Sequence, residues 1–326
     1  MPTIDITKSL QAGIRRDAME MWRQEFPVFE KQQAVMLKML PYVALRKATY
    51  VFKESVPFPT FWGYGESRRY RTFKDRQLQI SLYPYQVAIP YSGWDKEDDQ
   101  LQDTKTHVQM AVKRFFQLPD KMIAEYLNGT ASLNPVLVTA YDGANVFSAT
   151  DGDGAARFGV VGGNIVTGSG AGSVAAFIND LCAAQRRFLK FLDPAGIPIF
   201  SEDDVQYTKL HVVGPNEFNG VFQKASKSEN IRSDTQSITA ETNFLMGEFK
   251  YHLNPYLTNV NNYFVFVEHG YYRPFAYRAP GEVRQIFADM SNSDRARDVN
   301  EEVLFSDCRV GMGPFQPACG IKINNS

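Results

Sequence analysis

The chain has 326 residues, of which 44% are apolar, enough to fill the core of one large or two medium domains. Its 35 basic and 36 acidic residues give a net charge of -1, which argues against a dedicated nucleic-acid binder with a basic surface. The 3 cysteines form no CxxC pair, which predicts free thiols in a reducing compartment. No signal peptide or membrane-length apolar run is visible, so we expect a soluble protein made in a cytoplasm.

Residues 4–45 have the pattern of amphipathic helices. Apolar residues recur at spacings of three or four, as one face of a helix requires: Ile14, Ala18, Met21, Trp22, Phe26 and Phe29. Pro27 interrupts this pattern, because its ring is poorly tolerated inside a helix. We therefore predict an N-terminal arm of two short helices, with a pair of ordinary core helices as the alternative.

The next segment, residues 51–91, changes to the pattern of β-strands. Prolines and glycines near its start argue against a helix, and apolar or β-forming residues then alternate with polar ones, at Tyr70, Thr72, Leu78, Ile80 and Leu82. This predicts a β-hairpin over residues 64–91. Basic residues gather at its tip, namely Arg68, Arg69, Arg71, Lys74 and Arg76. They could simply be solvated, face a nucleic acid, or contact an acidic partner.

A long helix is predicted over residues 95–127. It begins with acidic residues, which favour a helix N-terminus, at Asp95, Glu97, Asp98 and Asp99. One apolar face continues to Tyr126, so the helix would have about 30 residues and a length of roughly 45 Å. Pro119 is expected to kink this helix or to open a second one, and Asn128 and Gly129 mark its end.

The remaining sequence alternates between helices and strands. Residues 134–172 are rich in turns, and Ser173 is placed to cap a helix over residues 174–192. Further elements are predicted as a strand at 207–213, a helix at 217–227, and strands at 262–268 and 303–313. No internal repeat is present, so the fold class is mixed α+β.

None of the motifs in this sequence forms a recognisable catalytic or ligand-binding set. Gly168, Gly170 and Gly172 precede a helix, but Ser173 stands where the dinucleotide motif needs its last glycine. Asp151 and Asp153 resemble the start of a calcium loop, yet position twelve is Gly162 rather than glutamate. The four histidines are scattered, and no GxSxG motif is present. We therefore expect no catalytic residue, no cofactor and no metal site.

An ordered set of short motifs resembles the Mu-like phage major head subunits. The motifs are VAIP at 87–90 with EDDQL at 97–101, LPD at 118–120 with YLN at 126–128, YDG at 141–143 with FS at 147–148, and LHVVGP at 210–215. They appear in the family's order and cover roughly residues 85–220.

This resemblance implies the Hong Kong 97 capsid fold, in which an N-terminal arm and an extended β-hairpin loop precede a peripheral domain and an axial domain. The implied boundaries are 1–50 for the arm, 51–92 for the extended loop, 93–135 with 262–300 for the peripheral domain, and 136–261 with 301–326 for the axial domain.

The resemblance also implies a non-enzymatic function: a major capsid protein of a tailed bacteriophage, which assembles in the host cytoplasm and resides in the virion. Its implied partners are copies of itself in pentamers and hexamers, scaffolding, portal and decoration proteins, and packaged double-stranded DNA held by weak, non-specific contact. Three alternatives remain: an encapsulin-type compartment shell, a minor phage structural protein, and a small-molecule enzyme that uses the glycine-rich loop.

The family geometry places the extended loop on the adjacent subunit, which gives the basic tip a candidate partner. We hypothesise an inter-subunit contact between the basic tip and the acidic helix start, made by Arg68, Arg69, Arg71, Lys74 and Arg76 on one side and Glu97, Asp98 and Asp99 on the other. An exposed ion pair contributes only about 0–1 kcal/mol, so such a contact would set register by repetition over many copies.

Overall fold

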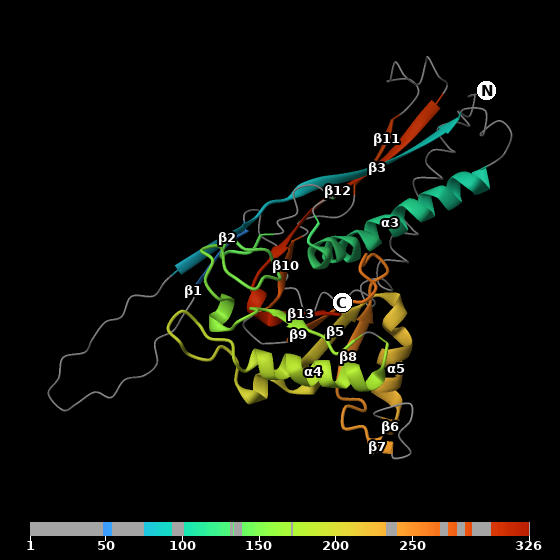
Figure 1. The fold of residues 1–326 in the computed structure, drawn as a ribbon. Coiled ribbons are helices and arrows are strands. Elements are labelled where there is room, and N and C mark those ends of the chain that lie inside the picture. The colour runs from blue at the N-terminus through green and yellow to red at the C-terminus, as the bar shows by residue number, and fades with distance from the viewer. Residues whose placement is uncertain are drawn as a thin grey trace, which may run out of the picture. The chain divides into compact units, whose positions relative to one another are not determined.

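The computed structural model describes residues 48–53, 75–92, 101–130, 133, 139–170, 172–232, 240–267, 273–278, 284–288 and 301–325. These residues belong to two compact units. Unit 1 draws on Leu82–Pro119 and Arg278–Gly311, and unit 2 on Met39–Ser81, Asp120–Tyr277 and Met312–Ser326. Helices and strands both contribute, as Figure 1 shows, which confirms the predicted α+β class. The predicted arm over residues 4–45 lies outside the described residues.

The sheet of unit 1 is built around β12 (Glu301–Pro314). It pairs antiparallel with β3 (Tyr83–Ser92) and with β11 (Arg284–Ala288). β3 contains Pro84 and Pro90 and pairs with β12 alone among the described strands, which is the edge position where a strand tolerates proline. The strand predicted at 303–313 is thereby confirmed.

The hairpin predicted over residues 64–91 is described only from Asp75 onwards, so its first strand, with Tyr70 and Thr72, lies outside the described residues. Leu78 and Ile80 lie in β2 (Asp75–Ile80), which pairs antiparallel with the earlier β1 (Ala48–Lys53), while β3 pairs with β12. Alternation in a sequence indicates that a strand exists but not which strand lies beside it. The tertiary structure buries Ile80 of β2 in a small cluster with Ala276 and Phe315, a contact that sequence alternation does not reveal.

The predicted long helix is present as α3 (Leu101–Asn128), which has 28 residues. It continues through Pro119, so the proline does not open a second helix. The helix ends as predicted: Gly129 has φ +71°, and the N–H of Thr130 donates to the carbonyl of Glu125 at 2.9 Å. Among the described helices, none is long and apolar enough to cross a membrane.

A five-stranded sheet forms the centre of unit 2. Its strand order is β4-β13-β9-β5-β8, with β9 antiparallel to both of its neighbours. β5 and β9 are buried along their whole length, which explains why β9 is a continuous apolar run and why β5 is apolar apart from His211. The strands are β4 (Ile165–Thr167), β13 (Gly320–Asn324), β9 (Tyr263–Val267), β5 (Leu210–Gly214) and β8 (Lys250–Leu253).

The family resemblance implied that residues 262–300, which include β9, belong to the peripheral domain, and that β5 and β13 belong to the axial domain. In the structure, β9 pairs with both β5 and β13 in one sheet. The other predicted domain boundaries stay a prediction. The strand predicted at 207–213 begins only at Leu210, because the three preceding residues form a 3-10 helix.

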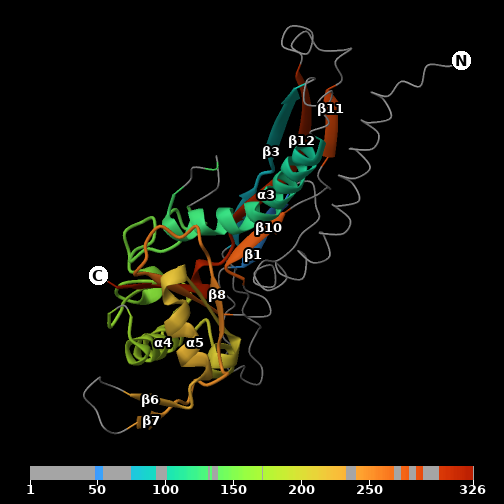
Figure 2. The same cartoon turned by 90° about the vertical axis from the view of Figure 1, so that its right-hand side faces the viewer.

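One face of the sheet is covered by α4 (Val174–Phe188) and α5 (Asn219–Lys227), which lie side by side in Figures 1 and 2. The predicted cap is present, since Oγ of Ser173 accepts from the N–H of Ala176 at 3.0 Å. The core between helices and sheet is strongly aromatic; for example, the ring of Phe177 lies 5.1 Å from that of Phe222.

The opposite face of the sheet carries a second aromatic layer, in which Phe147 packs against Phe264 at 5.1 Å and Phe275 against Phe266 at 5.3 Å. The remaining short elements are β6 (Asn230–Arg232), β7 (Ala240–Thr242), β10 (Phe275–Arg278), η1 (Arg157–Gly159), η2 (Glu202–Val205), η3 (Tyr207–Lys209), η4 (Asn216–Phe218) and η5 (Pro317–Cys319). β6 and β7 pair with each other and stand clear of the sheet in Figure 2.

Candidate functional site

The glycine-rich loop between β4 and α4 is occupied by the protein's own side chains. The N–H of Ser169 donates to Oδ1 of Asp180 at 2.7 Å, and the N–H of Gly170 donates to Oδ1 of Asn325 at 3.2 Å. Gly168 donates its N–H to the carbonyl of Asn324 at 3.0 Å. A phosphate-binding loop needs these N–H groups free for the ligand, so the loop does not have the geometry of a nucleotide site.

The Asp180 carboxylate that closes this loop is itself buried, with 2% of the residue exposed. Its second oxygen accepts a hydrogen bond from Oη of Tyr263 at 2.8 Å, and this contact contributes, after burial, to raising the pKa of the Tyr263 hydroxyl. The carboxylate therefore links α4, β9 and the loop, which is a structural role.

The acidic turn at residues 151–154 is also closed by its own hydrogen bonds. Oδ1 of Asp151 accepts from the N–H groups of Asp153 at 3.1 Å and of Ala155 at 2.8 Å, which is a local side-chain turn. Within the described part of the chain, no three histidine, cysteine or acidic side chains are grouped to hold a metal ion.

Two histidines that are distant in the sequence come together across β5 and β8. Nδ1 of His211 lies 3.4 Å from Nε2 of His252, and the rings are stacked. Burial, then His211 and Lys250, lowers the pKa of His252 to about 4, so it is neutral at pH 7. Sequence spacing alone gave no signal for this pair, which lacks a third ligand for a zinc site among the described residues.

The three cysteines are free, as predicted. Cys182 lies in α4 with its Sγ 3.4 Å from Oη of Tyr207. Burial raises the pKa of Cys308 to about 11 and raises that of Cys319 further above its ordinary value. Thiols with raised pKa values are poor nucleophiles, because the thiolate is the reactive form.

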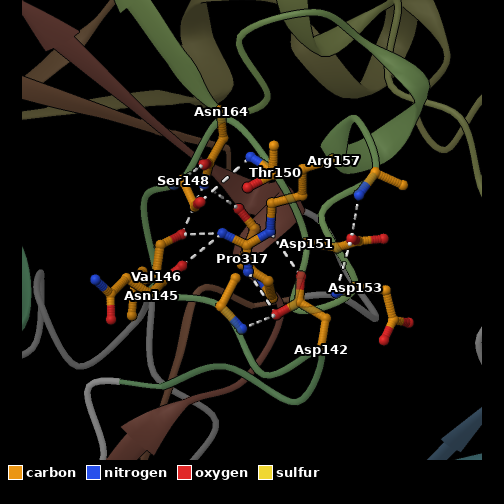
Figure 3. A network of polar contacts seen from close by, with 12 residues as sticks. Asp142, Asn145, Val146, Ser148, Thr150, Asp151, Asp153, Arg157, Asn164 and Pro317 are labelled. Carbon is orange, nitrogen blue, oxygen red and sulfur yellow. Dashed lines mark hydrogen bonds and ion pairs between the residues drawn. The ribbon is translucent and has the colours of Figure 1, made fainter.

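A network of polar contacts in unit 2 surrounds Arg157, as Figure 3 shows. Arg157 is 1% exposed and forms a two-pronged ion pair with Asp142, from Nε at 2.7 Å and from Nη2 at 2.9 Å. Its Nη1 donates to the carbonyls of Asn145 at 2.6 Å and Val146 at 2.8 Å. Each of the three guanidinium nitrogens therefore has at least one acceptor, as a buried charge requires.

Asn164 extends this network to the C-terminal segment. Its Nδ2 donates to the carbonyls of Val146, Pro317 and Gly320 at 2.8, 3.2 and 3.2 Å, and its Oδ1 accepts from the N–H of Ser148. The network thus ties the turn-rich loop to residues more than 150 positions away. Asp142 belongs to the YDG motif, but nothing in the sequence pairs it with Arg157.

The predicted inter-subunit contact falls almost entirely outside the described residues. Of its eight residues, Arg76 alone is described, in β2 opposite Phe52 of β1. The others lie outside, namely Arg68, Arg69, Arg71, Lys74, Glu97, Asp98 and Asp99. The contact therefore stays a prediction.

The long helix, the β12-centred sheet and the helix-covered five-stranded sheet together define a known class of fold. The chain has the α+β fold of Hong Kong 97-type capsid subunits, which matches about 89% of its length. No protein-family model and no curated protein matches the sequence, so this classification comes from solved structures.

Three of those structures show the extent of the likeness. The first is the capsid of an empty GTA (gene transfer agent) particle computed with C5 symmetry, at a TM-score of 0.56 and 11% identity, covering 89% of this chain and 88% of that one. The second is Mycobacterium phage Ogopogo, at a TM-score of 0.54 and 12% identity, covering 90% and 92%. The third is the capsid of a native GTA particle, at 0.53 and 12%, covering 88% and 87%.

Proposed function

We propose that this protein is the major capsid subunit of a tailed bacteriophage or of a related DNA-carrying particle, and that it acts by assembly rather than by catalysis. One observation carries the proposal: the capsid fold matches 88–90% of this chain and 87–92% of each of the three capsid chains. Little of the sequence is left for a separate activity.

The charge balance of the chain is compatible with assembly. The chain carries 35 basic and 36 acidic residues, so copies do not repel one another strongly. Identical subunits that bury complementary surfaces gain strength when a ring or shell closes. The proposed partners are copies of this chain in pentamers and hexamers, scaffolding, portal and decoration proteins, and weakly held DNA, with the virion as the final location.

Negative-stain electron microscopy of the purified protein tests the proposal. The expected result is closed, uniform shells, either from the subunit alone or with the scaffold expressed beside it. Uniform shells that carry protein cargo and no nuclease-protected DNA after infection would instead indicate an encapsulin-type compartment. A protein present in only a few copies per particle would be a minor structural component, and monomers under every condition would contradict a shell subunit.

The finer assignment to the Mu-like head subunits is also a proposal. Its motifs have structural roles in this chain: LPD and YLN lie in α3, LHVVG forms β5, and the aspartate of YDG is Asp142, which pairs with Arg157. An experimental structure of the particle superposed on a Mu-like head tests it. Residues 85–220 should align without a shift in register.

The electrostatic clamp between neighbouring copies remains a proposal for the basic tip. The β1–β2 ladder is two-stranded, and an isolated two-stranded hairpin is marginal in water, so it needs a surface to lie on. Reversing Arg68, Arg69 and Arg71 to Glu should lower assembly yield and its dependence on salt. Reversing Lys224 and Lys227 of α5 to Glu is the matched control, since both are exposed cations.

Two results would decide the clamp. Unchanged yield and salt dependence in the tip variant would show that the clamp is wrong. Partial rescue by Glu97, Asp98 and Asp99 to Lys would identify the partner surface. The proposed arm is tested separately: removal of residues 1–26 should impair assembly and leave a soluble, folded subunit, whereas loss of the folded subunit would place those residues in a core.

A further inference from the structure

Two large apolar side chains are exposed in the turn that follows β7. Phe244 is 57% exposed and Met246 is 51% exposed, while Leu245 between them is fully buried in the core of unit 2. The ring of Phe244 lies 5.9 Å from that of the half-buried Tyr207. We call Tyr207, Phe244 and Met246 the apolar knob. Isolated exposed apolar residues are ordinary, but a contiguous group indicates an interaction surface.

Hydrogen bonds to the C-terminal end of α5 fix the backbone of the knob. Asn243 is buried, and its Nδ2 donates to the carbonyls of Ala225 at 2.6 Å and Ser228 at 2.8 Å. Its Oδ1 accepts from the N–H of Leu245 at 3.0 Å, and the N–H of Gly247 donates to the carbonyl of Ser226 at 2.9 Å. A turn that is ordered before contact loses little conformational entropy on binding, which favours affinity.

Charges of both signs lie near Tyr207 of the knob. Arg186 is close enough to Tyr207 to influence its hydroxyl, while Glu202 and Asp203 lie exposed in η2 shortly before Tyr207. Lys209 donates to the carbonyl of Asp203 on the same side. A nucleic-acid surface would be predominantly basic. An apolar centre rich in aromatic residues and methionine, with a mixed polar rim, has the composition of a protein–protein interface.

The partner that fits this surface is a second copy of the chain. A mixed-sign rim on a chain of net charge -1 lets identical copies approach without repulsion. A head-to-tail ring also requires each copy to offer one surface to a different surface of the next copy. This step rests on the proposed function, which makes identical copies the most abundant neighbours of every subunit.

We propose that the apolar knob of Tyr207, Phe244 and Met246 is a contact between adjacent copies within the shell, and that it inserts into a different surface of the neighbouring copy. The interface is then heterologous, and each subunit contributes one knob and one receiving surface.

Single substitutions at the knob test the proposal. Phe244→Ser and Met246→Gln should each raise the subunit concentration at which shells form by about tenfold or more, as loss of an interface anchor does. The matched control is Val260→Ser, because Val260 is 46% exposed and lies outside the knob. Light scattering and electron microscopy measure assembly, and circular dichroism checks that each free subunit is folded.

A second measurement does not depend on substitution. Hydroxyl-radical oxidation of Met246, followed by mass spectrometry, should be severalfold slower in wild-type shells than in free subunits. Equal oxidation in both forms, normal assembly of Phe244→Ser, or equal impairment by Val260→Ser would each overturn the contact and leave the capsid function standing. Failure of the wild-type protein to form any shell, alone or with its scaffold, would overturn the proposed function together with the contact.

Discussion

Replacement of Asp142 by asparagine should destabilise unit 2 by about 3 kcal/mol or more. The change keeps the size of the side chain but removes the negative charge that pairs with Arg157 at 2.7 and 2.9 Å. The Asp142 side chain is only 10% exposed and that of Arg157 is 1% exposed, so water screens the pair little. Loss of one partner from a buried ion pair costs about 3–5 kcal/mol, because the remaining charge has no counter-charge.

Urea unfolding of the free subunit, followed by far-ultraviolet circular dichroism, measures the effect. A loss of 3 kcal/mol lowers the unfolding midpoint by about 1 M or more, at a slope of about 3 kcal/mol per M or less. An unchanged slope shows that the comparison reports stability. Asp153→Asn is the matched control, because Asp153 is exposed in the same loop, and a surface change of this kind stays within about 0.5 kcal/mol.

A loss of less than about 1 kcal/mol for Asp142→Asn would refute the argument that the pair compensates for burying Arg157. The double variant Asp142→Leu with Arg157→Met provides a further check. It leaves no unpaired charge in the core, so it should be considerably more stable than the sum of the two single changes predicts. Simple additivity would show that the two side chains are not energetically coupled.

Three further predictions concern partly buried positions of unit 2. Gly168→Ala places a Cβ 1.9 Å from Oδ1 of Asn325, so we expect a loss of about 1–3 kcal/mol in the same urea titration. Burial raises the pKa of Asp120 to about 6, so the folded state binds the proton more tightly than the unfolded state does. Asp120→Asn should therefore stabilise the subunit by up to about 3 kcal/mol above pH 6, and a gain that persists below pH 4 would contradict this. Burial, and then the charges of His211 and Lys250, lower the pKa of His252 to about 4, so the unfolded state binds more protons and stability falls as the pH drops from about 6.5 to 4. His252→Gln should reduce this loss of stability in melting curves taken across that pH range.

The sequence by itself determined most of the individual elements. Ser173 caps α4, and Gly129 ends α3 in a left-handed conformation, because both signals act on backbone groups within a few residues. β5 and β9 were recognisable as strands because both are short and mainly apolar, as strands buried on both faces are. An ordered set of short motifs also carried the family resemblance, which implied the capsid fold.

Only the tertiary structure decided which elements and side chains lie together. β2 pairs with β1, β3 pairs with β12, and β9 joins β5 and β13, because strand pairing depends on which faces can be buried together.

The same limit applies to the polar groups. The ion pair between Asp142 and Arg157 and the hydrogen bond from Gly170 to Asn325 join residues 15 and 155 positions apart. Their geometry arises because buried charges and N–H groups must find partners wherever the fold places them, and sequence spacing does not record that placement.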